Sequence, residues 1–293
     1  MPVGARSTVL VTGASGFLGR HVVRLLLERS HCVVAVSRNP ASLADLEHAR
    51  LTAIVGDIER EVPPIEPGMT VIQLAALRIG VRQRRARYFA MNHDATLRLA
   101  SSALAAGVSR FINVSTAVVL GPSRGAPLDE THQIGRSEGR NAYIDSRAAA
   151  LLDLERMVKN GLPLVTLMPS IVFGPDHSSR PNYITSHIRR ILSSPVRIHI
   201  GHADRVRSLA FVDDVVNAIV QAVECELDPG SRFLLAGSEV SMREFEELVF
   251  ELAGKWRSPV IRLPHTLARA FSGLADGLIR RGKGRGSGSE LRI

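Results

Sequence analysis

The chain of 293 residues has a hydrophobic content of 45%, which suits one large domain, or one domain with a smaller second lobe. Its formal net charge of +9 raises the question of nucleic-acid binding, but only 4% of the residues are aromatic. The two basic clusters, 78–87 and 280–292, lack the aromatic residues of a base-stacking surface, so we expect no nucleic-acid partner and favour an anionic small molecule.

Apolar runs alternate with helical patterns through most of the chain, which predicts parallel strands joined by helical crossovers. Because these runs are continuously rich in Val, Ile and Leu, we expect their strands to be buried on both faces. The predicted fold class is α/β, with a doubly wound parallel sheet and a smaller α+β lobe that caps the substrate. The expected strands are 8–12, 32–37, 51–55, 70–74, 110–114, 164–168 and 232–235.

After Pro169 the pattern becomes less regular, and this part predicts the second lobe. It contains an expected helix at 183–192, a strand at 196–200, and a capping box of Ser241 with Glu244 that opens a helix ending near Ala253. The segment 208–212 and a helix at 213–224 are then expected to return toward the first domain, and the segments 259–263 and 267–279 complete the small second lobe.

The expected division of the chain is into a cofactor domain, a lobe and a tail. The cofactor domain covers 1–170, and 206–237 returns to it. The substrate-binding lobe covers 171–205 and 238–280. Residues 281–293 form a low-complexity basic tail that we expect to be flexible.

Three glycines at three-residue spacing follow the first expected strand and open a helix expected at 17–28. Gly13 suits a tight turn, Gly16 leaves room for a pyrophosphate beside the backbone, and Gly19 lets the helix pack close to the sheet. The positive end of the helix would then lie on the phosphates. This strand-loop-helix context predicts dinucleotide binding. The residues assigned to the cofactor in this loop are Gly13, Ser15, Gly16, Phe17, Leu18 and Gly19.

The end of the second expected strand bears on the choice of cofactor. An acidic residue there would bind a free ribose 2′-hydroxyl group, whereas a cation would pair with a 2′-phosphate. The chain reads Ser37-Arg38, and no carboxylate lies between Glu28 and Asp45. We therefore expect NADP(H) to be favoured over NAD(H), with a solvated loop charge as the alternative interpretation of Arg38.

Several further motifs occur in order along the chain. Besides Thr12–Gly19 they are Gly56–Ile58, Gln73–Ala76, Asn92 with Leu97–Ala100, Phe111–Gly121, Tyr143–Arg147, Pro169–Pro175 and Phe211–Asp214. With these motifs, over about residues 8–265, the chain resembles the extended short-chain dehydrogenases/reductases of the NAD(P)-dependent epimerase/dehydratase family. The resemblance implies a Rossmann-type fold and an NAD(P)-dependent oxidoreductase or epimerase.

The resemblance also assigns cofactor contacts beyond the glycine loop. Asp57 and Ile58 would flank the adenine, and Ala75 with Ala76 would border the ribose and phosphates. The remaining residues assigned to the cofactor are Ser37, Arg38, Tyr143, Arg147, Pro169 and Val172.

The resemblance implies that Tyr143 is the general acid/base and that Thr116 holds the substrate oxygen, with Ser115 as a weaker candidate. A free phenol has a pKa of about 10, so a phenolate base at neutral pH needs a nearby cation. The family carries lysine four residues after the tyrosine, whereas this chain carries Arg147. A guanidinium group keeps the charge and the donors, but it is bulkier and does not relay a proton. The alternative interpretation is a core tyrosine with a surface arginine.

Two residues are assigned to the substrate besides Thr116. Arg207 resembles the arginine with which nucleotide-sugar members of the family hold a diphosphate, and Asn182 either contacts the substrate or caps the following helix. The basic segment from Arg78 to Arg87 follows the fourth strand, where ligands bind in such sheets, or it is a solvated loop.

We thus expect oxidation or reduction at a carbinol/ketone carbon of an anionic substrate, such as a nucleotide-activated sugar, alone or as half of an epimerisation. Two alternatives stay open: a reductase of a hydrophobic ketone, resembling flavonol- and steroid-acting members, and a non-catalytic NADP(H)-binding regulator.

The remaining expectations concern metals, location and assembly. The ten histidines show no ligand spacing and the two cysteines are dispersed, so no metal site is expected. No apolar run reaches the length of a membrane span and no signal peptide is recognisable, which predicts a cytoplasmic protein without a transmembrane segment. A homodimer is compatible with the chain.

Overall fold

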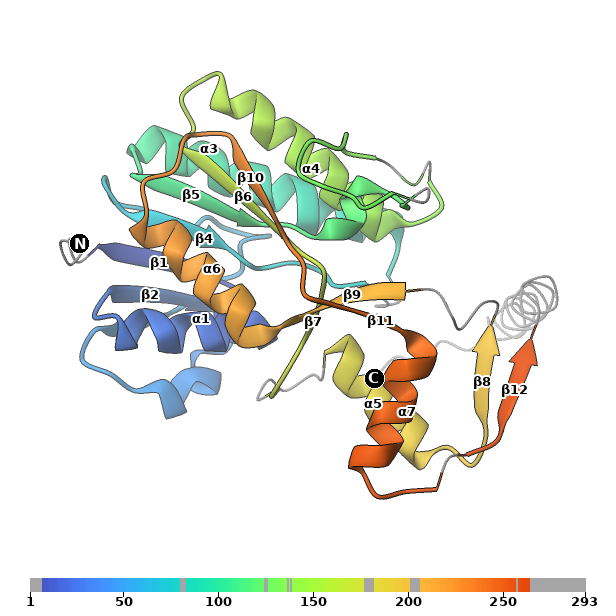
Figure 1. Cartoon of the computed structure of the whole chain (residues 1–293). Coiled ribbons are helices and arrows are strands. Elements are labelled where there is room, and N and C mark those ends of the chain that lie inside the picture. Colours follow the sequence, from blue (N-terminus) through green and yellow to red (C-terminus); the bar gives the residue numbers. More distant parts are fainter. Residues whose placement is uncertain are drawn as a thin grey trace, which may run out of the picture. The chain divides into compact units, whose positions relative to one another are not determined.

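The computed structural model describes residues 7–79, 83–123, 126–135, 137, 139–176, 182–200, 206–256 and 258–263. The chain divides into two units, 1–185 with 208–238 and 186–207 with 239–293. Figure 1 shows the elements of both units. The segment 267–279, expected in the second lobe, and the basic tail at 281–293 lie outside the described residues.

Within the described residues, the first unit contains a seven-stranded sheet in the order β10-β6-β5-β4-β1-β2-β3 (Figure 1). Every neighbouring pair in this sheet is parallel. The strands are β1 (Thr8–Thr12), β2 (Cys32–Ser37), β3 (Leu51–Val55), β4 (Thr70–Gln73), β5 (Arg110–Val114), β6 (Leu164–Pro169) and β10 (Ser231–Leu235).

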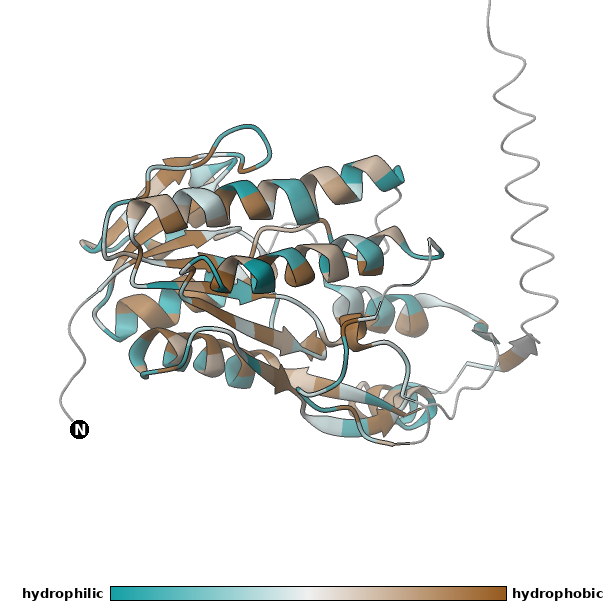
Figure 2. Cartoon of the chain, turned by 90° about the horizontal axis from the view of Figure 1, so that it is seen from above, coloured by the Kyte–Doolittle hydropathy of each residue, from teal (hydrophilic) through white to brown (hydrophobic). Residues whose placement is uncertain are grey.

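Helices cover both faces of this sheet. One hydrophobic cluster joins Val9 and Val11 of β1 to α1 (Phe17–Glu28) and α6 (Val212–Glu224). A second cluster joins Leu10 of the same strand to α3 (Ala95–Ala106) and α4 (Ala142–Val158) on the opposite face. Adjacent strand residues point to opposite faces, and both faces are apolar here; Figure 2 shows the strands of the sheet largely brown. The doubly wound α/β fold is confirmed.

The strand order reverses between β1 and β4. The chain runs from β1 to β2 and β3 on one side, and β4, β5, β6 and β10 follow on the other. Thr12 pairs with Gln73 at the carboxyl ends of the two central strands. Ligands of doubly wound sheets bind at the carboxyl ends beside such a reversal, so the fold itself marks where a site is to be sought.

Shorter elements connect these layers. The 3-10 helix η1 (Pro40–Leu46) links β2 to β3, and η3 (Ala117–Leu120) follows β5. The helix α2 (Arg85–Phe89) continues through the π-helix η2 (Ala90–Asp94) into α3. A three-stranded sheet has the order β11-β9-β7, with β7 (Ile171–Phe173) parallel to β9 (Val206–Phe211); β11 spans Ser238–Ser241.

The second unit contains helical and strand segments from two parts of the chain. They are the larger part of α5 (Tyr183–Ser193), β8 (Arg197–Ile200), α7 (Met242–Leu252) and β12 (Val260–Leu263). β8 and β12 pair in parallel. The predicted capping box is confirmed, since Glu244 N donates to Ser241 Oγ at 3.2 Å and Ser241 N donates to Glu244 Oε2 at 2.9 Å.

No helix in the described part of the chain combines the length and apolar character needed to cross a membrane.

Candidate active site

The loop between β1 and α1 closes tightly at its glycines. Gly13 has a φ of +66°, and a Cβ atom there would lie 2.8 Å from the backbone nitrogen of Ala75. A Cβ atom on Gly19 would overlap the carbonyl oxygen of Gly13. Gly16 N donates to that same carbonyl oxygen at 2.9 Å. Glycine is therefore required at positions 13 and 19, and α1 begins directly against the end of the strand.

The first turn of α1 is suited to an anion. Its N-cap residue is Gly16, which has no side chain that could accept a hydrogen bond from the helix, and the turn contains no acidic residue. The N–H groups of a helix start need acceptors, and the helix dipole adds positive potential there. These features fit the pyrophosphate of a dinucleotide. Phe17 and Leu18 pack, partly buried, against the hydrophobic cluster beneath the loop.

Ser37 at the end of β2 is linked to the glycine loop. Its buried hydroxyl group lies 2.9 Å from Ser15 Oγ and accepts a hydrogen bond from Asn39 N at 3.1 Å. Arg38, the next residue, is exposed. The end of β2 therefore carries the exposed residue Arg38 next to a partly buried hydroxyl pair, Ser37 and Ser15 of the glycine loop.

The carboxylate nearest in sequence after this strand end, Asp45, already has a cationic partner. Arg20 of α1 pairs with Asp45 and also donates to the carbonyl oxygen of Ser42. The hydrogen bond from Arg20 lowers the pKa of Asp45 below its ordinary value. The positive charge of Arg38 is thus not matched by this carboxylate.

The segment after β3 lies against the end of β2. Gly56 N donates to the carbonyl oxygen of Ser37 at 3.0 Å, and a Cβ atom on Gly56 would lie 2.7 Å from Val36 Cγ1. Asp57 Oδ1 accepts a hydrogen bond from Glu59 N at 3.1 Å, while Ile58 is buried. The two residues assigned to the adenine are therefore held beside the β2 end by their own turn.

Two buried polar residues fix the segment that follows β4. Thr12 Oγ1 donates to Gln73 Oε1 and accepts hydrogen bonds from Leu74 N at 3.2 Å and Ala75 N at 3.3 Å. Gln73 Nε2 donates to the carbonyl oxygen of Ala75 at 3.0 Å. Ala75 is thereby brought against Gly13, with Ala76 exposed beside it.

Asn92 in η2 is fully buried and joins this segment to α4. Its Oδ1 accepts a hydrogen bond from Leu77 N at 2.7 Å, and its Nδ2 donates to Leu77 O at 3.1 Å and to Ser146 Oγ at 3.2 Å. The side chain therefore has a structural role that connects the end of β4 with the helix of Tyr143.

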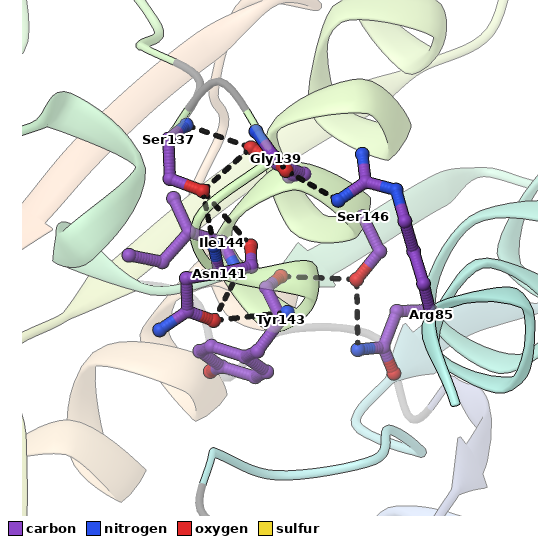
Figure 3. A network of polar contacts seen from close by, with 9 residues as sticks. Arg85, Ser137, Gly139, Asn141, Tyr143, Ile144 and Ser146 are labelled. Atoms are coloured by element: carbon purple, nitrogen blue, oxygen red, sulfur yellow. Dashed lines mark hydrogen bonds and ion pairs between the residues drawn. The ribbon is translucent and has the colours of Figure 1, made fainter. Parts of the chain in front are cut away.

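Tyr143 lies in the first turn of α4, where its backbone is fixed on both sides (Figure 3). Tyr143 N donates to the N-cap side chain Asn141 Oδ1 at 3.0 Å, and Tyr143 O accepts from Ser146 Oγ at 2.9 Å. Its ring packs edge-on against Tyr88, with centroids 6.4 Å apart. The side chain itself is partly exposed.

Arg147 follows Tyr143 by four residues, which places both side chains on the same face of α4. The guanidinium group is buried, and its Nη2 atom donates to the carbonyl oxygen of Val114 at the end of β5. Burial lowers the pKa of Arg147, and the adjacent Tyr143 opposes that effect. Arg147 is thus a buried cation at the carboxyl end of the sheet, which excludes the alternative of a helix-surface charge.

The hydroxyl groups of Ser115 and Thr116 follow the same strand end. Ser115 N donates to Leu167 O at 2.7 Å, whereas its buried hydroxyl group has no protein partner in the described residues. Thr116 is the N-cap residue of η3 and is partly exposed. The link from Arg147 to Val114 therefore brings the arginine to the strand from which Thr116 extends.

The other predicted site residues have separate surroundings. Pro169 ends β6 and Val172 lies within β7. Asn182 is buried and caps α5, since Oδ1 accepts from Thr185 N at 2.8 Å. Arg207 is an exposed residue of β9 in the second unit. The assignments of Asn182 and Arg207 to a substrate stay predictions.

The basic segment after β4 is partly neutralised. Arg85 pairs with Asp145 at 2.7 Å, and Arg87 pairs with Glu59. Arg82 lies outside the described residues. Two of the cations that sequence reasoning offered to an anionic ligand are therefore engaged in ion pairs.

Sequence reasoning missed the residues that hold this site together: Thr12, Gln73, Asn141 and Asp145. Thr12 and Gln73 carried a signal, because each is a polar residue that follows an apolar run at the carboxyl end of its strand. Asn141 is a recognisable N-cap residue before the helix. No sequence signal marked Asp145, because the groups that bind its carboxylate lie in other segments of the chain.

Among the described residues, no cluster of histidine, cysteine, aspartate or glutamate side chains could hold a metal ion.

Comparison with known proteins gives one family and several relatives. The NAD dependent epimerase/dehydratase family matches residues 9–236. A 3-beta-hydroxysteroid dehydrogenase of Mycolicibacterium neoaurum is 28% identical, covering 87% of this chain and 72% of that protein. A UDP-glucose 4-epimerase of Vibrio cholerae is 27% identical, covering 88% and 78%. The structure of MoeE5 in complex with UDP-glucuronic acid and NAD superposes with a TM-score of 0.73 at 28% identity, covering 88% and 86%.

Proposed function

Because this chain belongs to the NAD dependent epimerase/dehydratase family, we propose that it oxidises or reduces a carbinol/ketone carbon of a nucleotide-activated sugar with NADP(H). Its class, an NAD(P)-dependent oxidoreductase or epimerase, follows from the family and its relatives. The observation that supports the proposal is the position of Arg147. This buried cation lies on the same face of α4 as Tyr143 and contacts the end of β5.

The chain's own residues supply acid/base chemistry and orientation. In the oxidising direction the carbinol O–H bond breaks and its proton passes to Tyr143 Oη, while the hydrogen on carbon leaves with its electron pair. The dinucleotide supplies the hydride-accepting or hydride-donating carbon when it is bound. Thr116 holds the reacting oxygen by a hydrogen bond, and the charge of Arg147 stabilises the phenolate of Tyr143. Reduction is the same sequence reversed.

The preference for NADP(H) rests on the end of β2. Arg38 is exposed, and the carboxylate nearest in sequence after it is paired with Arg20. A guanidinium group there suits a 2′-phosphate better than a free hydroxyl group. The hydroxyl groups of Ser15 and Ser37, joined at 2.9 Å, add neutral hydrogen-bonding groups at the same place.

Replacing Tyr143 by Phe tests the proton transfer. Tyr143→Phe keeps the ring packing against Tyr88 but removes the hydroxyl group, so turnover should fall by orders of magnitude while NADPH affinity is largely kept. Tyr183→Phe, at a ring that is 55% exposed in α5, is the matched control. Steady-state kinetics and fluorescence titration of NADPH measure both quantities. Near-parental turnover of Tyr143→Phe would assign the proton transfer to another residue.

A second candidate substrate is a hydrophobic ketone or steroid, which the 3-beta-hydroxysteroid dehydrogenase relative favours. The UDP-glucose 4-epimerase relative favours the nucleotide sugar. A panel of UDP- and dTDP-sugars and of steroids and aryl ketones, each with NADP⁺ or NADPH, separates the two by absorbance at the nicotinamide band. Epimerisation leaves that absorbance unchanged, so sugar products are also separated chromatographically. Turnover confined to the steroids would overturn the nucleotide-sugar assignment.

A further inference from the structure

Asp145 lies in α4 between the two residues assigned to catalysis, two positions from each. At 100° per residue it points to the side of the helix away from Tyr143 and Arg147. Its side chain is nonetheless 2% exposed. A buried carboxylate this close to the site requires partners, because an unpaired buried charge is strongly destabilising.

Four donors from two other segments meet this carboxylate. Oδ1 accepts from Ser137 N at 2.7 Å and from Ser137 Oγ at 2.9 Å. Oδ2 accepts from Gly139 N at 3.0 Å and from Arg85 Nη1 at 2.7 Å. Burial by itself would raise the pKa of Asp145, but these hydrogen bonds outweigh it and lower the pKa below its ordinary value. Asp145 is therefore ionised at neutral pH.

The first link leads from Asp145 to the backbone of Tyr143. Ser137, held by Asp145, accepts a hydrogen bond on its Oγ from Asn141 N at 2.7 Å. Asn141 in turn caps α4, with Oδ1 accepting from Tyr143 N at 3.0 Å and Ile144 N at 3.3 Å. Figure 3 shows these groups together at the start of the helix. The cap that fixes the Tyr143 peptide thus depends on a segment that Asp145 anchors.

The second link leads from Asp145 to the ring of Tyr143. Arg85, the partner of Asp145, is the first residue of α2, where its guanidinium group also lies 4.9 Å from the centre of the Phe89 ring. The same short helix carries Tyr88, whose ring packs edge-on against Tyr143. The ion pair therefore holds α2 where Tyr88 supports the Tyr143 ring.

We propose that Asp145 is a positioning residue for Tyr143, which it sets through the Ser137–Asn141 cap on one side and through Arg85 and Tyr88 on the other. This inference rests on the proposed function, because it takes Tyr143 as the proton-transferring group. The carboxylate of Asp145 is bound by protein donors and points away from Tyr143 and Arg147, so its role is to position Tyr143.

Two variants and one control test the proposal. Asp145→Asn removes the charge of the buried partner. Arg85→Gln removes the ion pair and the guanidinium contact with Phe89 from a side chain that is 50% exposed, so we expect it to fold even if Asp145→Asn does not. Asp153→Asn is the matched control: it lies on the same helix and is likewise joined to the preceding helical segment, through His93 Nε2 at 2.9 Å.

The first readout needs no substrate. The chain has only three tyrosines, so ring-labelled tyrosine NMR resolves Tyr88 and Tyr143 once single Phe variants have assigned the signals. Asp145→Asn should shift both ring signals and speed the hydrogen exchange of the Tyr143 and Ile144 amides. Arg85→Gln should shift the ring signals alone. Asp153→Asn should change neither.

The second readout is kinetic. Misplacement of a reacting group by about 1 Å costs roughly 10²-fold in rate, so Asp145→Asn should lower kcat by up to that factor while KM and NADPH affinity stay unchanged. Unchanged ring signals and unchanged amide exchange in a folded Asp145→Asn protein would overturn the proposal. If Asp145→Asn does not fold, unchanged ring signals in Arg85→Gln would overturn it instead. Changes in the Asp153→Asn control as large as those in Asp145→Asn would also overturn the proposal. Failure of the proposed function shows differently, as a parent without turnover whose Tyr143 signals still respond to Asp145→Asn.

Discussion

The guanidinium group of Arg147 fills a place where the family resemblance leads one to expect an amine. It is wider than an ammonium group and has five N–H donors in a fixed plane. One of these donates to the Val114 carbonyl oxygen, while the Nε atom is buried without a partner in the described residues. The arginine is therefore held by the sheet rather than by solvent, and its charge is fixed near Tyr143.

Two substitutions of Arg147 distinguish the contribution of its charge from the contribution of its shape. Arg147→Lys keeps the charge and should leave activity similar or improved, whereas Arg147→Met removes it. Without the cation the phenolate of Tyr143 is less stable, so the pH–rate profile should move to higher pH. The measurement compares pH–rate profiles of the parent and both variants on one substrate. An unchanged profile in Arg147→Met would show that this arginine does not assist Tyr143.

In the proposed function, Arg38 controls the choice between the two cofactors. A charge-assisted contact with a 2′-phosphate is worth about 1–3 kcal/mol, so the parent should bind NADPH more tightly than NADH by a corresponding factor. Arg38→Ala should remove most of that difference. Arg24→Ala, which removes the same charge from an exposed position in α1, should not. Fluorescence titration decides, and equal affinity of the parent for both cofactors contradicts the assignment.

At the scale of elements, the junction of β1 with α1 leaves no space for a side chain at Gly19. A Cβ atom there would overlap the Gly13 carbonyl oxygen and lie 2.8 Å from Ala14 Cα. The neighbouring atoms are backbone, so they give way only by moving the loop. The same loop carries the N–H groups that fit a pyrophosphate, and its shape and its binding role are therefore inseparable.

Gly19→Ala should accordingly reduce both stability and cofactor affinity. Overpacking of this kind costs about 1–3 kcal/mol in the free energy of unfolding. Gly135→Ala is the control, because a Cβ atom at Gly135 would meet nothing closer than 3.7 Å. Urea denaturation and NADPH titration give the two quantities. A Gly19→Ala protein as stable as the parent would mean that the loop relaxes freely.

The regular elements were largely predictable because their signals are local. The expected bounds 8–12, 17–28, 32–37, 51–55 and 110–114 agree with β1, α1, β2, β3 and β5. The capping box of α7 was predictable for the same reason, since Ser241 and Glu244 are three residues apart. The π-helical turn of η2 was not, because the buried Asn92 within it binds Leu77 and Ser146, which are distant in sequence and leave no local signal.

The same distinction applies to the site. The glycine spacing predicted the turn at Gly13 and the close approach at Gly19, and both are observed. The burial of Arg147 could not be foreseen, because it depends on a carbonyl group of β5, 33 residues earlier. The surroundings of Asp145 were equally hidden, since Arg85 is 60 residues away and no local pattern pairs the two.

At the scale of the whole molecule, the second unit has a buried charge cluster of its own. Glu246 of α7 is 3% exposed. Its carboxylate accepts hydrogen bonds from Arg197 Nη1 at 2.9 Å and His199 Nε2 at 2.8 Å, and His187 Nε2 lies 3.2 Å away. Burial alone would raise the pKa of Glu246, but the contacts with His187, His199 and Arg197 lower it to about 2.

Acid should therefore weaken this unit through Glu246. A carboxylate whose pKa is depressed in the folded state stabilises the protein above the unfolded pKa of about 4.3, and this contribution is lost as the pH falls towards about 2. The depression corresponds to a free energy of order 3 kcal/mol. Glu246→Gln should be destabilised by about that amount at pH 7 and should converge with the parent near pH 2.

The measurement is the free energy of unfolding from urea denaturation at pH values between 7 and 2. Glu251→Gln, at an exposed position of the same helix, should follow the parent throughout. A stability difference between Glu246→Gln and the parent that does not shrink with falling pH would show that the charge of Glu246 is not what stabilises the unit.

The buried amide of Asn92 couples the position of the segment after β4 to the position of α4, although the two are distant in the sequence. Its carbonyl oxygen and one N–H group hold the peptide of Leu77, next to the segment assigned to the cofactor, and it also donates to Ser146, whose hydroxyl group holds the carbonyl oxygen of Tyr143. Thermodynamic linkage makes such coupling reciprocal. A displacement of the β4 loop therefore carries a free-energy cost at the Tyr143 peptide, and a displacement of that peptide carries the same cost at the loop.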